Sequence, residues 1–222
     1  VHDRPDEFGV WGEQAPAEQV EPLAEVEQAL INAPERLKRV QKAFVQILRA
    51  LAHIHDHRII HRDLKPANVM VTSDGDVLLM DFGIAVDSEE DHAVVDTGQL
   101  VGTFAYMSPE QLRATDTDLR SDLYALGVML FELLSGRRPF EADSPAAAIY
   151  QHVFQLPPDL GTLNPGAPDE LVKLTMQLLS KARGDRPASA WDVLFRFGEE
   201  PNRLRAINVF RPDLIGRADE LK

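Results

Sequence analysis

Two short segments of the chain concentrate acidic, basic and amide side chains at close spacing. Residues 61–68 read His-Arg-Asp-Leu-Lys-Pro-Ala-Asn, which supplies a carboxylate at Asp63, a cation at Lys65 and a carboxamide at Asn68. A second carboxylate, Asp81, opens an Asp-Phe-Gly sequence further along the chain. Phosphoryl transfer needs an acceptor hydroxyl aimed at the γ-phosphorus and cations that neutralise the phosphate oxygens, with little covalent work from the protein. These residue types could together perform that chemistry.

An amphipathic helix is predicted immediately before the first segment. Pro34 suits a first helical turn, and the pattern ends near His57. The apolar residues that recur at helical spacing are Phe44, Ile47, Leu48, Leu51 and Ile54. This helix would pack one face on a core and deliver the chain to Asp63.

Between the two segments the pattern changes from helix to hairpin. Two short apolar runs, 69–71 and 77–80, flank an Asp-Gly pair at residues 74 and 75. Asp-Gly between apolar runs is a strong signal for a hairpin turn. Two short antiparallel strands are therefore expected to connect Asn68 with Asp81.

Three further helices are expected in the second half of the chain. Segment 123–134 is apolar on nearly every side, which is typical of a helix buried all round. Segments 169–179 and 190–197 have apolar residues on one stripe only. The predicted fold class is therefore α+β and mainly α, with one small hairpin.

Composition excludes several classes of protein. The chain has 222 residues, 44% of them hydrophobic, no cysteine and a formal net charge of -13. Such an acidic chain disfavours nucleic acid and anionic membranes as partners, and no apolar run is long enough to span a bilayer. The absence of cysteine excludes a disulfide framework and is compatible with a reducing compartment. We expect a cytoplasmic protein with no nucleic-acid or membrane contact within this chain.

The order of the motifs resembles that of the eukaryotic-type serine/threonine protein kinases, in the form that bacterial relatives show. The resemblance covers about residues 35–198 and includes Gly-Thr at 102–103 and Ser-Pro-Glu at 108–110. It implies a protein-kinase-like fold, represented here by the large C-terminal lobe with a small β-hairpin and with the N-terminal lobe absent. The implied reaction transfers the γ-phosphate of ATP, with Mg²⁺, to serine or threonine hydroxyls of protein substrates.

The resemblance also implies roles for the site residues. Asp63 would accept or orient the proton of the substrate hydroxyl, and Lys65 would contact the transferring phosphate of ATP. Asn68 and Asp81 would hold magnesium. Thr103 matches the family threonine that hydrogen-bonds the catalytic aspartate and lysine.

Five residues are assigned structural roles by the same resemblance. His61 is expected to be buried and satisfied by backbone groups, and Gly83 completes Asp-Phe-Gly, which by itself could be a simple turn. Glu110 would pair with Arg186, and a buried pair of this kind is structural by default. Asp122 would brace the backbone of the catalytic loop, with a plain helix cap as the alternative.

A regulatory role is expected for Arg62, which directly precedes the catalytic aspartate. In this family that arrangement marks control by phosphorylation of the activation loop, because a phosphate can dock on the arginine. Thr97 is the first candidate phosphosite and Ser88 the second. The chain's own activation loop is therefore an expected partner and substrate.

Half of the nucleotide site expected of a complete kinase is missing from the sequence. No Gly-x-Gly-x-x-Gly occurs, and the only lysines before the catalytic loop, Lys38 and Lys42, fall within the predicted helix. One hypothesis is a piece of an active kinase whose small lobe lies upstream. The other is a pseudokinase-like docking or scaffold module. The complete set of base and magnesium residues favours the enzyme.

Three segments are expected along the chain. Residues 1–33 would form a linker or residual segment with a short helix, and 34–200 the kinase C-terminal lobe. Residues 201–222 would lead toward a downstream domain, because 215–221 resemble the opening signature of AAA-like and signalling ATPases. A simple helix start is the alternative for that short motif.

Overall fold

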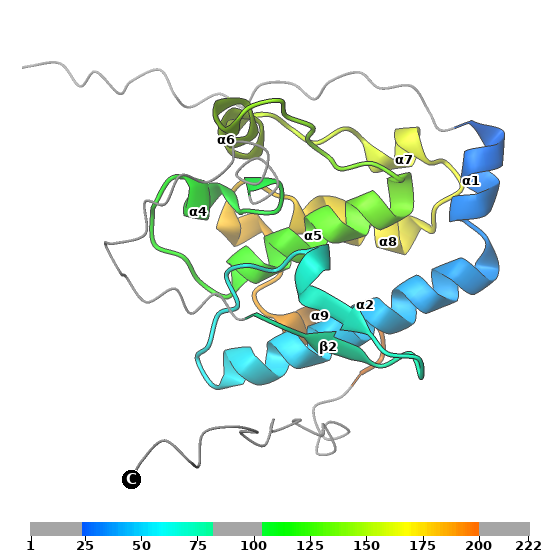
Figure 1. The fold of residues 1–222 in the computed structure, drawn as a ribbon, viewed down its shortest axis with the longest axis horizontal. Helices are drawn as coiled ribbons and strands as arrows, with labels where there is room; N and C mark the ends of the chain where they lie inside the picture. The colour runs from blue at the N-terminus through cyan, green and yellow to red at the C-terminus, as the bar shows by residue number, and fades with distance from the viewer. Residues whose placement is uncertain (1–23, 82–103, 200–222) are drawn as a thin grey trace, which may run out of the picture.

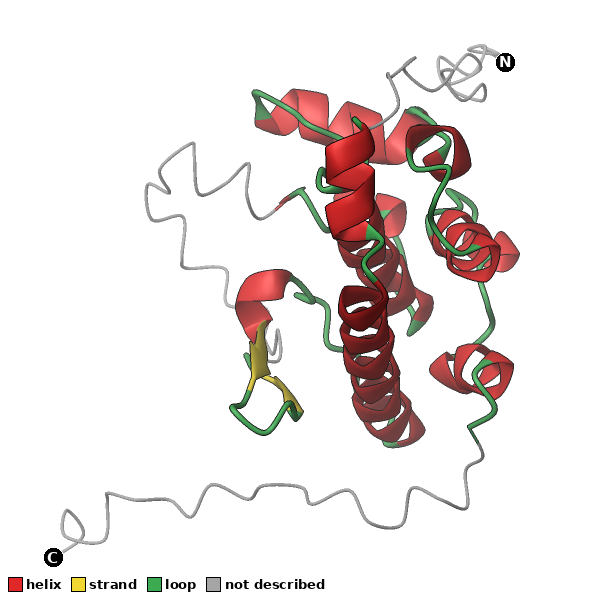
Figure 2. Cartoon of the chain, turned by 90° about the vertical axis from the view of Figure 1, so that its right-hand side faces the viewer, coloured by secondary structure: helices red, strands yellow, loops and turns green. Residues whose placement is uncertain are grey.

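Helices form most of the molecule, and the one sheet found within the described residues is a two-stranded hairpin. The structure, a computed structural model, describes residues 24–81 and 104–199. The elements in chain order are α1 (Glu25–Ile31), α2 (Pro34–Asp56), β1 (Val69–Val71), β2 (Val77–Leu79), α4 (Pro109–Leu112), α5 (Arg120–Ser135), α6 (Pro145–Phe154), α7 (Leu160–Leu163), α8 (Asp169–Leu178) and α9 (Ala190–Arg196). Figures 1 and 2 show the hairpin at one edge of the helical body. The predicted mainly helical fold with one hairpin is confirmed.

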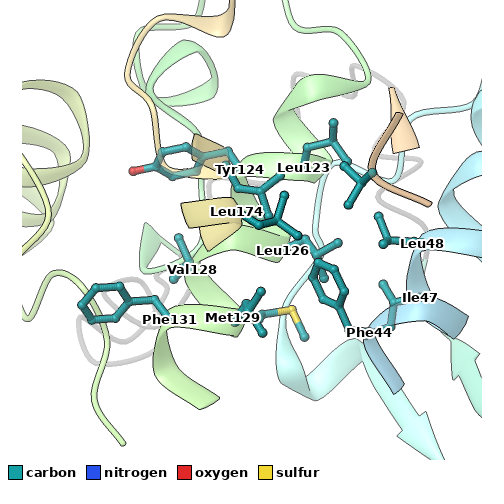
Figure 3. Packing of buried hydrophobic residues seen from close by; sticks show 14 of the residues in the cluster. Phe44, Ile47, Leu48, Leu123, Tyr124, Leu126, Val128, Met129, Phe131 and Leu174 are labelled. Atoms are coloured by element: carbon teal, nitrogen blue, oxygen red, sulfur yellow. The ribbon is translucent and has the colours of Figure 1, made fainter. Parts of the chain in front are cut away.

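Helix α5 is the centre of the core, as its uniformly apolar sequence predicted. Leu123, Leu126 and Phe131 are fully buried, and α2 supplies Phe44 and Leu48 from the adjacent side (Figure 3). Helix α8 approaches α5 closely at Gly127, where an added Cβ would lie 2.7 Å from the Cβ of Leu178. A larger residue at that position would force the two helices apart.

The side chain of Gln46 in α2 forms hydrogen bonds to the turn and to the second strand of the hairpin. Gln46 donates from Nε2 to the Gly75 carbonyl at 3.0 Å and accepts the Val77 N–H at Oε1 at 3.1 Å. The strands pair antiparallel, with Val69 opposite Leu79. The Met80 N–H then donates to the Asn68 carbonyl at 2.9 Å. This register brings the backbone before Asp81 next to Asn68, although the two residues lie far apart in the sequence.

The short helix predicted within residues 1–33 is α1, and polar contacts hold it to the lobe. Asn32 and Asn164 exchange side-chain hydrogen bonds of 2.8 and 3.1 Å. Arg36 donates to the carbonyls of Ile31 and Leu133 at 2.8 and 2.6 Å. These contacts hold the end of α1 against the last turn of α5 and the residue that follows α7.

A membrane-spanning helix is not found in residues 24–81 or 104–199, since none there combines the required length with sufficient apolar character.

Candidate active site

Three of the predicted site residues converge in the loop that follows α2. The Lys65 Nζ lies 2.8 Å from the Asp63 Oδ2. Asn68 is buried, and its Nδ2 donates to the Asp63 carbonyl at 2.7 Å and to the Asp63 Oδ2 at 2.9 Å. The carboxylate of Asp63 is therefore held between an amide donor and a cation, while part of it stays open to solvent.

The loop that carries Asp63 has a strained backbone, and Asp122 holds it. Arg62 has a φ of 65°, a left-handed conformation that costs a residue with a side chain about 1 kcal/mol or more. Asp122, at the start of α5, accepts the N–H of His61 and of Arg62, each at 2.8 Å. The N-cap of α5 is Leu119, without a side-chain hydrogen bond. The observed contacts of Asp122 are thus those of a brace on the loop.

Two histidines complete the support beneath the loop. His61 is fully buried, and its Nε2 lies 3.1 Å from the Met80 carbonyl, which links the loop to the end of the hairpin. The His55 Nε2 lies 2.8 Å from the Asp122 Oδ2. The role of His55 was not predicted, because a histidine near the end of an amphipathic helix gives no sign of a partner 67 positions away.

Asn68 and Asp81 have the chemistry to hold Mg²⁺. The Asn68 Nδ2 makes both hydrogen bonds to Asp63, which leaves the amide oxygen as a ligand. Asp81 is exposed at the end of the hairpin, with a φ of 49°. Magnesium prefers oxygen ligands and takes several of them from phosphates and water. The described residues contain no cluster of three or more acidic or histidine ligands, so phosphate and water would supply the remainder.

The next motif lies against the catalytic loop. Gln111 of α4 donates from Nε2 to the Arg62 carbonyl at 2.7 Å. Ser108 caps α4 by accepting the Gln111 N–H. Four further predicted site residues, Gly83, Ser88, Thr97 and Thr103, lie outside the described residues.

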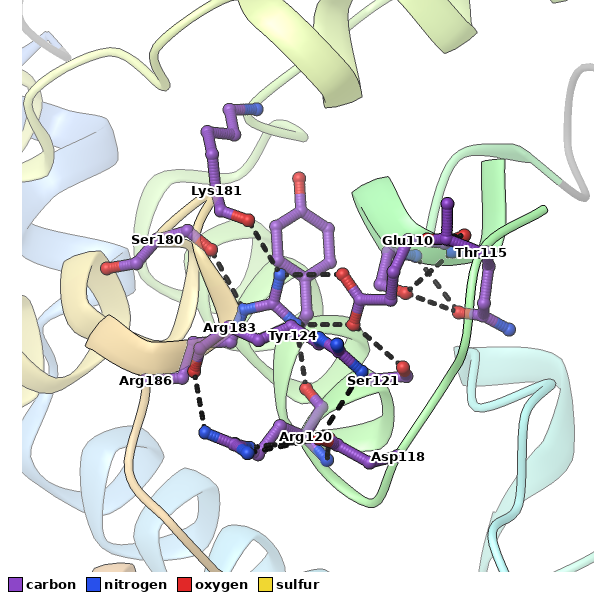
Figure 4. A network of polar contacts seen from close by, with 12 residues as sticks. Glu110, Thr115, Asp118, Arg120, Ser121, Tyr124, Ser180, Lys181, Arg183 and Arg186 are labelled. Atoms are coloured by element: carbon purple, nitrogen blue, oxygen red, sulfur yellow. Dashed lines mark hydrogen bonds and ion pairs between the residues drawn. The ribbon is translucent and has the colours of Figure 1, made fainter. Parts of the chain in front are cut away.

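A second polar network, remote in sequence from the catalytic loop, is centred on Arg186 (Figure 4). Arg186 donates to Glu110 through two nitrogens at 2.7 and 2.9 Å, and Ser121 donates its hydroxyl to the same carboxylate at 2.7 Å. The guanidinium also donates to the carbonyls of Ser180, Arg120 and Lys181. Every part of this buried pair has a partner.

Ionisation of the network follows from these contacts. Burial alone would raise the pKa of Glu110, but the hydrogen bonds and charge of Arg186, with the Ser121 hydroxyl, hold that pKa below its ordinary value. The carboxylate therefore stays charged, as a bidentate pair requires.

Lys181 is a buried cation that was not anticipated. Its Nζ donates to the carbonyls of Gln151 and His152 at 3.0 and 2.7 Å, and it lies 4.1 Å from the centre of the Phe140 ring. Burial, followed by the charges of Arg186 and Arg113, lowers the pKa of Lys181 to about 7. The two carbonyls belong to the last turn of α6, so Lys181 ties that helix to the network.

Comparisons with known proteins show the family to which the chain belongs. The sequence matches the protein kinase domain over residues 12–194, which is most of the chain. The chain belongs to the protein kinase family. The kinase match confirms the resemblance and the protein-kinase-like fold.

Curated bacterial relatives carry names of one enzyme class. The chain is 42% identical over 160 residues to the DNA damage-responsive serine/threonine-protein kinase RqkA of Deinococcus radiodurans, covering 72% of this chain and 24% of the relative. It is 38% identical over 163 residues to the serine/threonine-protein kinase PknB of Mycolicibacterium smegmatis, covering 73% and 26%. A probable PknB of Lactococcus lactis is 40% identical over 150 residues, covering 68% and 24%. The chain spans about a quarter of the length of these relatives.

The kinase match begins inside the segment 1–33. The boundaries at residues 34 and 200 and the ATPase-like start within 201–222 stay predictions.

Proposed function

We propose that this chain carries the catalytic lobe of a serine/threonine protein kinase, which transfers the γ-phosphate of ATP to serine or threonine hydroxyls of proteins. The observation that carries the proposal is the convergence of Lys65 and Asn68 on the carboxylate of Asp63. The printed names of the bacterial relatives support the substrate hydroxyl class.

Each residue has a distinct task in the proposed reaction. Asp63 orients the hydroxyl of the protein substrate and accepts its proton as the oxygen attacks the γ-phosphorus. Asn68 fixes the Asp63 Oδ2 by a 2.9 Å hydrogen bond, so the carboxylate is already positioned before substrate binds, with its other oxygen left to accept the proton. Lys65, whose Nζ is beside the Asp63 Oδ2, stabilises negative charge on the transferring phosphate.

Magnesium fits beside these groups. Asn68 and Asp81 would hold the ion, which would neutralise charge on the phosphate oxygens of ATP. Asp81 is exposed at the hairpin end, so its carboxylate is accessible to the ion.

Regulation through the chain's own activation loop belongs to the same proposal. Arg62 is exposed, so its guanidinium is available to a phosphate on Thr97 or, second, on Ser88. Thr103 would contact Asp63 and Lys65. A cytoplasmic location and the absence of nucleic-acid partners complete the proposal, on the basis of the acidic, cysteine-free composition.

Single-turnover transfer from labelled ATP with magnesium tests the function in the complete protein. Asp81→Asn should abolish transfer, whereas Asp74→Asn, which changes an exposed aspartate in the hairpin turn, should leave it unchanged. We expect label on Thr97 in the wild type, and a Thr97→Ala variant with unchanged labelling and activity would remove the phosphosite assignment.

The same experiment decides between enzyme and scaffold. A folded complete protein that neither transfers phosphate nor binds ATP in a magnesium-dependent way would overturn the kinase proposal. The pseudokinase-like docking or scaffold function would then replace it.

A further inference from the structure

A groove separate from the catalytic loop runs along α2. Its volume is about 470 Å³, and its walls are α2, the turn of the hairpin and the chain that follows α9. Helix α2 packs against both β2 and α9, which overlap it in the view of Figure 1. Its lining includes Lys38, Lys42, Val45, Arg49 and Phe197.

The walls of this groove are fixed by contacts of their own. Gln46 ties the hairpin turn to α2 through its two hydrogen bonds. The Phe197 ring packs edge-on against Phe44 at 5.8 Å between centroids. Val45 and Phe197 are both partly buried against the core, so they form an apolar base. The groove is therefore a stable surface feature.

Cations with unused bonding capacity surround that base. Lys42 makes no ion pair with any described residue, and Lys38 pairs only with Glu35, at 3.0 Å with both side chains more than 70% exposed. Such an exposed pair contributes little and is easily exchanged. Arg49 pairs with Glu199 through Nη2, yet its buried Nε has no acceptor among the described residues.

The basic character of the groove is local. Asp76 and Glu199 also line it, but the cations outnumber them, while the chain as a whole has a net charge of -13. With three cations against two carboxylates, the groove has a small excess of positive charge, which would favour binding of a negatively charged segment here over other parts of the acidic chain. Electrostatic complementarity of this kind selects both the partner and its orientation.

The spacing of the cations sets the size of the ligand. Lys38, Lys42, Val45 and Arg49 recur at helical intervals of three or four, so they share one face of α2. Lys38 and Arg49 are eleven residues apart, which corresponds to about 16 Å along the helix axis. An extended chain of about five residues has the same length.

We propose that this groove docks a short acidic segment of a protein partner, a substrate or a regulator. Its carboxylates would pair with Lys38 and Lys42, and an apolar side chain between them would pack on Val45 and Phe197. None of these residues belongs to the catalytic loop, so the partner would dock without covering Asp63.

Fluorescence anisotropy with the complete protein tests the proposal. The probe is a fluorescein-labelled peptide with glutamates and aspartates around a central pair of leucines. Its neutral analogue carries glutamine and asparagine instead. The acidic probe should bind, and the neutral analogue should bind at least about tenfold more weakly, because charge pairing supplies the selectivity.

Charge-reversal variants locate the binding. Lys42→Glu should weaken acidic-probe binding about tenfold, and Lys38→Glu/Lys42→Glu should remove it. Lys173→Glu, which makes the same charge change on an exposed position of α8, should have little effect. Transfer of phosphate to a short serine peptide should be unchanged in all three variants.

Several results would overturn the proposal. Equal weakening by Lys173→Glu would reduce the effect to bulk charge, and equal binding of the neutral analogue would remove the role of the lysines. Absence of binding would mean that the groove takes no acidic partner. Self-association of the protein that Lys42→Glu abolishes would assign the groove to a second copy instead.

Discussion

Two carboxylate–cation pairs in this lobe have nearly the same geometry and different surroundings. Asp63 and Lys65 are 2.8 Å apart with side chains 34% and 25% exposed, whereas Glu110 and Arg186 are 2.7 Å apart with side chains 6% and 0% exposed. In the first pair each partner can exchange the other for a substrate group. In the second, every hydrogen-bonding group is already used by the protein.

Burial, and not the distance between the charges, distinguishes a pair that can react from a pair that is structural. An exposed pair contributes about 0–1 kcal/mol to stability. Removing one partner of a buried pair leaves an uncompensated charge and costs about 3–5 kcal/mol. The partly exposed Asp63–Lys65 pair can therefore separate during the reaction with little loss of protein stability.

The largest expected effect breaks the buried pair. Glu110→Ala should lower the free energy of unfolding by about 3–5 kcal/mol, because the Arg186 guanidinium would stay buried without its carboxylate. Urea unfolding of the complete protein, followed by far-UV circular dichroism, measures the change. Asp63→Asn is the matched substitution in the exposed pair. It should change stability by less than about 1 kcal/mol while phosphate transfer falls about 10²–10⁴-fold.

The proposed difference between the two pairs would be wrong if Asp63→Asn, and not Glu110→Ala, caused the large loss of stability. A stability loss below about 1 kcal/mol for Glu110→Ala would show that the buried pair contributes no more than a surface pair.

An intermediate effect is expected at Asp122, which joins the catalytic loop to the core. Asp122→Asn replaces one accepting oxygen by an amide donor, so one of the N–H groups of His61 and Arg62 would lose its acceptor at a cost of about 1–3 kcal/mol. Because Asp122 positions the loop, kcat should fall while the KM for ATP changes little. Hydrogen exchange at the two amides should accelerate.

Asp118→Asn serves as the control for this prediction. Asp118, which precedes α5, forms partly exposed ion pairs with Arg120 and Arg183. An equal decrease of kcat in both variants would mean that Asp122 supports the fold in general and does not position the loop.

A third effect concerns Lys181 and its dependence on pH. Folding lowers the pKa of Lys181 from 10.5 to about 7, so between these values the unfolded chain binds more protons than the folded protein. This group therefore makes stability rise with pH across that range and opposes folding below about pH 7. The Lys181→Met variant has no titrating amine at this position. The free energy of unfolding of the wild type, relative to this variant, should therefore rise between about pH 6 and pH 9.

Urea midpoints at the two pH values measure the difference. Parallel behaviour of wild type and Lys181→Met would show that the carbonyls of Gln151 and His152, with the Phe140 ring, keep Lys181 charged in the folded state.

Local patterns predicted the elements that carry the site. Pro34 and the apolar stripe of α2, the Asp-Gly turn between β1 and β2, and the all-round apolar run of α5 each specify structure through neighbours close in sequence. The pairing of Glu110 with Arg186 was predicted from the motif order, and the structure contains it. The contacts of His55 with Asp122 and of Lys181 with α6 were not predicted, because neither residue type indicates its distant partner.

The sequence by itself determined the family, the succession of helices and hairpin, and the set of groups available for phosphoryl transfer, since these depend on residue type and short-range spacing. Only the tertiary structure decided which charges are buried and which are free. Burial depends on packing among segments far apart in the chain, such as α2 against α5 or the hairpin against Gln46. That packing leaves Asp63 open to a substrate and Glu110 closed to one.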